Sequence, residues 1–129
     1  MWNIHGCFFI NIIKSKEVLV GYQVKLKFQV TQHTRDENLM RSIVSYLGCG
    51  NLYFVKPRKV TDYCVVKYSD LIEKIIPFFE NYPIIGVKSQ DFADFCRVAL
   101  LMKDRKHITL EGLNQIKHIK AGMNKGRCV

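Results

Sequence analysis

The sequence predicts an α+β domain with one four-stranded antiparallel sheet that is backed by helices. Two pairs of β-prone segments, within residues 7–32 and 51–68, each enclose a short turn, which favours antiparallel pairing of consecutive strands. Segments with apolar residues at helical spacing follow each pair, and helices of this kind cover one face of a sheet. The 129 residues are predicted to form a single domain, 1–129, without a linker or an evident repeat.

The first pair of strands is predicted at Cys7–Lys14 and Tyr22–Gln32. In the second strand apolar residues alternate with polar ones, so that one face holds Val24, Leu26, Phe28 and Val30 and the other holds Gln23, Lys25, Lys27, Gln29 and Thr31. The same alternation in the first strand turns Phe8, Ile10 and Ile12 inward. The opposite face then carries Cys7, Phe9, Asn11 and Ile13.

A helix and a second hairpin follow. Thr34 and Glu37 have the spacing of a capping box, and Gly48 is expected to end the helix that they start. The second hairpin is predicted at Asn51–Lys56 and Tyr63–Tyr68, around Pro57. Alternation would place five more residues on the polar face: Asn51, Tyr53, Asp62, Cys64 and Val66.

Three helices complete the predicted fold. Ser69 is expected to cap the first, which Pro77 should kink or shorten. Ser89 should cap the second, and Thr109 should start the third. The buried side of the second is predicted to hold Phe92, Ala93, Phe95, Cys96, Ala99 and Leu100. Asp91 and Asp94, three residues apart on that helix, are interpreted as a solvated face.

The composition favours a polyanionic partner. The net charge is +9, from 20 basic and 11 acidic residues, which favours nucleic acid first and an anionic membrane second. No apolar run approaches the length of about eighteen residues that a membrane span needs, and the N-terminus lacks the pattern of a signal or transit peptide. The five scattered cysteines are expected to be reduced thiols.

The polar face of the predicted sheet has the chemistry of a DNA-binding surface. Ten strand residues reach about 34 Å, roughly one turn of B-DNA, and Lys, Gln and Asn side chains bind purine edges in the major groove. The alternative is an ordinary solvated sheet face. Phe9 and Ile13 on the same face, together with the positive charge, favour nucleic-acid binding.

Three segments carry a resemblance to a known family: "GCFFINIIKSK…VKLKFQVTQHTRDENLMRSIVSYLGCG", "IIPFFENYPIIGVKSQDFADF" and "KHITLEGLNQIKHIKAGMNKGR". The chain resembles the C-terminal half of single-chain LAGLIDADG homing endonucleases from fungal mitochondrial introns, the I-OnuI-like group. The resemblance implies an αββαββα fold in which two halves form a saddle over double-stranded DNA and hydrolyse phosphodiester bonds with Mg²⁺. It also implies catalytic roles for Gln32, which would position water, and for Lys88, near the scissile phosphate.

The sequence departs from the family pattern at its start. The family's LAGLIDADG helix would precede Gly6, and its acidic metal ligand falls on His5, a poor ligand for Mg²⁺. We therefore expect a half that lacks its first helix and does not cleave DNA alone, with an N-terminal half-domain as partner. Its gene would lie in the mitochondrial genome. An intron RNA maturase and a non-functional remnant remain as alternatives.

Overall fold

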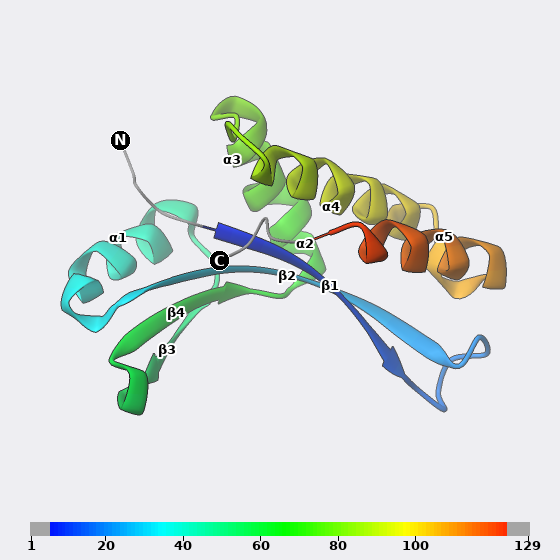
Figure 1. Cartoon of the computed structure of the whole chain (residues 1–129), viewed down its shortest axis with the longest axis horizontal. Coiled ribbons are helices and arrows are strands. Elements are labelled where there is room, and N and C mark those ends of the chain that lie inside the picture. Colours follow the sequence, from blue (N-terminus) through cyan, green and yellow to red (C-terminus); the bar gives the residue numbers. More distant parts are fainter. Residues whose placement is uncertain (1–5, 124–129) are drawn as a thin grey trace. The chain divides into compact units, whose positions relative to one another are not determined.

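The computed structural model describes residues 6–123 and contains four strands, β1 (Gly6–Lys14), β2 (Tyr22–His33), β3 (Asn51–Val55) and β4 (Val60–Val65). They form one sheet in the order β1-β2-β4-β3, and β4 pairs antiparallel with both β2 and β3 (Figure 1). The predicted four-stranded antiparallel sheet with helices is therefore confirmed.

The helices occur at the predicted places in the chain, one between the two pairs of strands and the others after the second pair. They are α1 (Glu37–Leu47), α2 (Tyr68–Asp70), α3 (Ile76–Asn81), α4 (Lys88–Lys103) and α5 (Leu110–Ala121). Four short turns adjoin them: η1 (Thr34–Asp36), η2 (Lys56–Arg58) and η4 (Lys106–Ile108), which are 3₁₀ turns, and the π-helical η3 (Leu71–Ile75). Among residues 6–123 there is no helix with the length and apolarity to cross a bilayer.

The described residues fall into two compact units. The first contains residues 27–82 with residues 6 and 7, and the second contains residues 8–26 and 83–123. Strand β2 contributes its C-terminal half to the first unit and its N-terminal half to the second. The single domain over residues 1–129 stays a prediction.

The core of the first unit lies between strands and helices. Phe28 and Val30 of β2 and Tyr63 and Val65 of β4 are at most 3% exposed. The buried side chains of the helices that cover them are Met40, Ile43, Leu71 and Ile75. The ring of Phe28 also meets that of Phe79 edge-on, with a centroid separation of 5.4 Å. Because strand side chains alternate, residues 27, 29 and 31 of β2 point to the opposite face.

The second unit packs α4 and α5 against β1 and the start of β2. The Phe8 ring lies 5.1 Å from that of Phe95, and Leu113 and Ile116 of α5 are fully buried. Two lysines of α5 also contact the strands. Lys120 donates a hydrogen bond of 2.6 Å to the carbonyl of Ile10, and the Lys117 ammonium lies 4.5 Å from the centre of the Tyr22 ring.

Three of the four predicted helix starts are wrong in detail. The hydroxyl of Thr34 accepts a hydrogen bond from Thr61, and Glu37 pairs with Arg41, so neither residue caps α1. Ser69 lies inside α2, and the hydroxyl of Ser89 donates to the carbonyl of Gly86.

The prediction for Thr109 is confirmed, because its hydroxyl accepts from the Gly112 N–H at 3.0 Å. Thr109 has the extended backbone (φ −104°, ψ 152°) that aims a side-chain oxygen at the first turn. The predicted helix end is also confirmed: Gly48 ends α1 in the left-handed conformation at φ 70°, with its N–H bonded to the Val44 carbonyl.

Two boundaries differ from the predictions for physical reasons. Strand β4 begins at Val60, because η2 and Lys59 complete the turn after Pro57, and it ends at Val65 because Tyr68 starts α2. Val66 therefore lies beyond the strand.

Pro77 interrupts the regular α-helical hydrogen bonding, because it has no N–H to donate. The π-helical turn η3 lies directly before α3, whose first turn contains Pro77.

The buried face of α4 differs from the prediction. Asp91 is only 2% exposed and shares the buried side with Phe95 and Val98, so its assignment to a solvated face is wrong. Leu100, expected inside, is exposed, and so is Ala93. Helical spacing places Asp91, Phe95 and Val98 on one face. The prediction assigned Asp91 to the opposite face because hydropathy alone places a charged residue in solvent.

His107 in η4 gives stability a pH dependence. Its Nδ1 atom is buried without a hydrogen-bond partner in the described part of the chain. Burial, and then the Arg105 guanidinium, lowers the pKa of His107. The unfolded chain therefore binds this proton more readily, so the free energy of unfolding falls as pH drops below about 6.5 towards the lowered folded pKa.

We expect the melting temperature of the wild type to fall more between about pH 7.5 and about pH 5.5 than that of a His107→Gln variant. His118→Gln, on an exposed position of α5, is the control and should keep the wild-type pH dependence. Thermal denaturation followed by circular dichroism at each pH measures the difference. Parallel curves for wild type and His107→Gln would contradict the assignment.

Candidate nucleic-acid interface

In the first unit, the polar face is built from two rows of side chains that run across three strands. Gln29 of β2 lies opposite Cys64 of β4, which in turn lies opposite Asn51 of β3. The neighbouring row consists of Thr31, Asp62 and Tyr53. All six residues have the face that alternation predicts, opposite the helix-covered core.

In the second unit, the side of β1 and of the start of β2 that faces away from the buried residues is mixed polar and apolar. Lys25 is exposed between the buried Val24 and Leu26, and Gln23 is half-buried. On β1, Phe9 and Asn11 are half-buried and Ile13 is 46% exposed. Phe8 and Ile10 alternate with them and are buried, as the sequence predicts.

Hydrogen bonds connect four polar side chains on the face of the first unit. Cys64 donates to Oε1 of Gln29 at 3.8 Å, Nε2 of Gln29 donates to Thr31 at 3.1 Å, and Thr31 donates to Oδ1 of Asp62 at 2.6 Å. Burial raises the pKa of the Cys64 thiol; the nearby Lys27 ammonium opposes this rise and the Asp62 carboxylate adds to it. The thiol is therefore a protonated donor at neutral pH.

The two predicted catalytic residues lie in different units. Gln32 belongs to the first unit, where it pairs with Thr61 within β2 and β4 and lies on the helix side of the sheet. Lys88 is the first residue of α4 in the second unit and is half-buried. The catalytic roles of both residues stay predictions.

Residues 6–123 contain no group of three or more His, Cys, Asp or Glu side chains that could hold a metal ion. His5, the position of the family's acidic ligand, lies outside the described residues, as does the basic segment from Lys125 to Arg127.

The expectation that the cysteines are reduced holds at three positions. Cys49, Cys64 and Cys96 are free thiols. Cys7 is disulfide-bonded, so the expectation is wrong there. Cys7 is half-buried at the start of β1, and a disulfide sulfur has no proton to donate.

Sequence reasoning left out the basic turn between β3 and β4. Lys56, Arg58 and Lys59 are all exposed there, and Lys59 adopts a left-handed backbone at φ 53°. The carbonyl of Lys59 accepts a hydrogen bond of 2.9 Å from the N–H of Thr34, which ties the turn to the end of β2. The charge run "KPRK" was the available signal.

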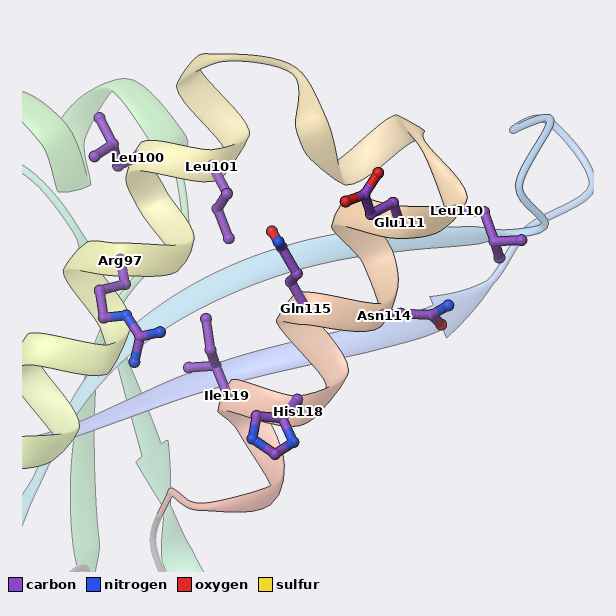
Figure 2. A pocket seen from close by; sticks show the side chains of 9 residues that line it. All are labelled: Arg97, Leu100, Leu101, Leu110, Glu111, Asn114, Gln115, His118 and Ile119. Carbon is purple, nitrogen blue, oxygen red and sulfur yellow. The ribbon is translucent and has the colours of Figure 1, made fainter.

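A separate open groove lies between α4 and α5 in the second unit (Figure 2). Leu100, Leu110 and Ile119 line it together with Arg97 and His118. None of the predicted site residues lines this groove.

Comparisons with known proteins identify relatives of the whole described fold. Residues 5–99 match the family model described as LAGLIDADG endonuclease. The "Probable intron-encoded endonuclease 3" of Neurospora crassa is 38% identical over 122 residues, which is 94% of this chain and 23% of that protein. The "DNA endonuclease I-CvuI" of Chlorella vulgaris is 30% identical over 80 residues, 58% of this chain and 48% of that protein.

Solved structures of this kind superpose closely. I-SmaMI, bound to an uncleaved DNA target in the presence of calcium ions, is 48% identical with a TM-score of 0.91, and the match covers 95% of this chain and 42% of that one. I-LtrWI, bound to target DNA, is 38% identical with a TM-score of 0.90, covering 97% and 42%. The chain thus spans less than half the length of each of these relatives. Because the family model covers most of the chain and these structures share its fold, this protein belongs to the LAGLIDADG endonuclease family.

Proposed function

We propose that this chain is one half of a homing endonuclease and that its open sheet face recognises about one half-site of a double-stranded DNA target. The observation that carries the proposal is the alternation along β2, where buried apolar residues alternate with Gln23, Lys25, Lys27, Gln29 and Thr31. The net charge of +9 supports it. So do I-SmaMI and I-LtrWI, which have the same fold and were solved with DNA.

The chemistry of the face suits the major groove. Lysine ammonium groups donate to guanine O6 and N7 or to phosphates, and glutamine amides form paired hydrogen bonds with adenine. Asp62 adds an acceptor on β4, and Cys64 adds a sulfur whose single proton is donated to Gln29. Asn51 and Tyr53 extend the surface onto β3, where both are exposed.

We assign phosphodiester hydrolysis to an assembly of two halves and not to this chain alone. In that assembly Gln32 would position water and the Lys88 ammonium would stabilise charge near the scissile phosphate. The imidazole of His5, at the position of an acidic ligand, is a weak ligand for Mg²⁺. The 129-residue chain is therefore expected to bind DNA without cutting it.

The partner and the location follow from the same proposal. A second half-domain would complete the enzyme, since the relatives are more than twice as long as the segment that this chain matches. Two relatives are named as intron-encoded endonucleases of Neurospora crassa and another as a protein of an ND4 intron. We propose a gene in a mitochondrial intron.

An intron RNA maturase is the second candidate, because the basic face is retained while His5 replaces the acidic ligand. Fluorescence anisotropy of the 129-residue chain with a labelled mixed-sequence DNA duplex about three helical turns long tests both candidates. Stronger competition by unlabelled duplex than by a folded transfer RNA supports the endonuclease half, and the reverse order supports the maturase.

Two further measurements test the other parts of the proposal. Double-strand cutting of plasmid DNA by the chain alone with Mg²⁺ would contradict the assignment of hydrolysis to two halves. Cooperative thermal unfolding would exclude a misfolded remnant.

A further inference from the structure

The hydrogen-bonded side chains on the face of the first unit have a fixed direction of donation. Thr31 and Asp62 are cross-strand partners, as are Gln29 and Cys64, so the four side chains link β2 to β4. The bonds run in one sense, from Cys64 through Gln29 and Thr31 to the carboxylate of Asp62.

The carboxylate sets this direction. An ionised carboxylate only accepts, so Thr31 gives its single proton to Asp62 and can only accept from Gln29. Gln29 must then present its NH₂ group to Thr31 and its carbonyl oxygen to the Cys64 thiol. A flipped amide would place Oε1 against a Thr31 oxygen with no proton left to donate.

We propose that Asp62, acting through Thr31, is a positioning residue that locks the Gln29 amide for the recognition of one adenine. This inference rests on the proposed function. The locked amide retains one N–H and one lone pair of Oε1, which are the groups that pair with adenine N7 and N6. Its orientation decides which end of the amide donates, and hence which base is accepted.

The exposure of Thr31 and Asp62 and the length of their hydrogen bond agree with a positioning role for Asp62. Thr31 is exposed and Asp62 is half-buried, so both lie at the surface of the sheet, and their bond at 2.6 Å is the shortest of the three. A hydrogen bond to a charged acceptor is about twice as strong as one between neutral groups, which favours one amide orientation over the other.

A set of variants separates positioning from direct contact. Thr31→Val removes the hydroxyl and leaves Asp62 in place, whereas Thr31→Ser keeps the hydroxyl. Asp62→Asn keeps the shape and supplies a donor, which frees the amide of Gln29 to flip. Asp36→Asn makes the same change in charge in η1, beyond the C-terminal end of β2, and is the matched control. Gln29→Ala identifies the base pair that Gln29 contacts.

The probe is a pool of DNA duplexes with a randomised segment of about one helical turn, from which bound molecules are selected and sequenced. We expect the wild type, Thr31→Ser and Asp36→Asn to select adenine at the position that Gln29→Ala affects. We expect Thr31→Val and Asp62→Asn to lose about tenfold of that preference, within the range of one paired base contact.

An unchanged preference in Thr31→Val together with a loss in Asp62→Asn would show that Asp62 contacts a base directly, and would overturn the positioning role. Unchanged preferences in both variants would overturn it as well. A wild-type chain that binds no duplex overturns the proposed function and this inference together. If the wild type binds and selects a sequence, the proposed function stands, and the variants then test the positioning role by itself.

Discussion

Replacing Lys25 and Lys27 by glutamate together is expected to lower the affinity of the chain for duplex DNA by about 100-fold or more at low salt. Both lysines lie on the polar face of β2, where Lys25 is exposed and Lys27 is half-buried. Each lysine that faces DNA displaces about one condensed cation. The negative slope of log affinity against log salt should therefore become shallower by about 0.9 for each lost contact. The glutamates add repulsion from the phosphates. Fluorescence anisotropy over a series of salt concentrations measures both effects.

A matched variant controls for the change in net charge. Lys103→Glu with Lys106→Glu makes the same change at exposed positions at the end of α4 and in η4. At physiological ionic strength it should lose far less affinity than the β2 variant and keep the wild-type salt slope, because salt screens distant charges more than direct contacts. If the two double variants lost affinity equally, β2 would have no special role in binding DNA.

The polar face was predictable because its signal is local. A strand has a side-chain period of two, so the alternation in residues 22–33 fixed which side chains share a face before any partner strand was known. The assignment extended to Asp62 and Cys64, whose register with Thr31 and Gln29 agrees with it.

The hydrogen bonds on that face were not predictable, since they depend on cross-strand register. Thr31 and Asp62 are 31 residues apart, and their contact exists only because β2 and β4 pair in one alignment. No pattern in the sequence indicates which polar group donates to which. The direction follows from the structure and from the chemistry of a carboxylate.

Helix starts failed for a related reason. A Ser or Thr hydroxyl caps a helix when its residue directly precedes the first turn with an extended backbone. Thr109 meets this condition, whereas Ser89 lies inside α4 and Thr34 lies in a 3₁₀ turn. The burial of Asp91 was missed for a different reason. A charged residue is rarely buried, so hydropathy assigns it to the exposed side of a helix.

Gly112→Ala is expected to have the largest effect on stability. Gly112 is buried in the first turn of α5, and a Cβ atom there would overlap the backbone carbonyl of Lys106 in η4. A backbone carbonyl cannot rotate away as a side chain can, so η4 and α5 must separate. Ala favours a helix over Gly by about 1 kcal/mol, but overpacking costs about 1–3 kcal/mol or more. The Thr109 cap, which bonds to the N–H of Gly112, would be lost with it and adds about 1 kcal/mol.

The cap loss and the gain in helix propensity cancel, so the net loss is about 1–3 kcal/mol or more of the free energy of unfolding, measured by urea denaturation. Gly122→Ala is the matched control, because the nearest atom to a Cβ there is the Ile119 carbonyl oxygen at 3.7 Å, an ordinary contact. Its backbone at φ −89° suits alanine, so its stability should stay within about 0.5 kcal/mol of the wild type. Equal stabilities of Gly112→Ala and Gly122→Ala would mean that η4 does not lie against the start of α5. The packing assigned to the second unit would then be wrong at that contact.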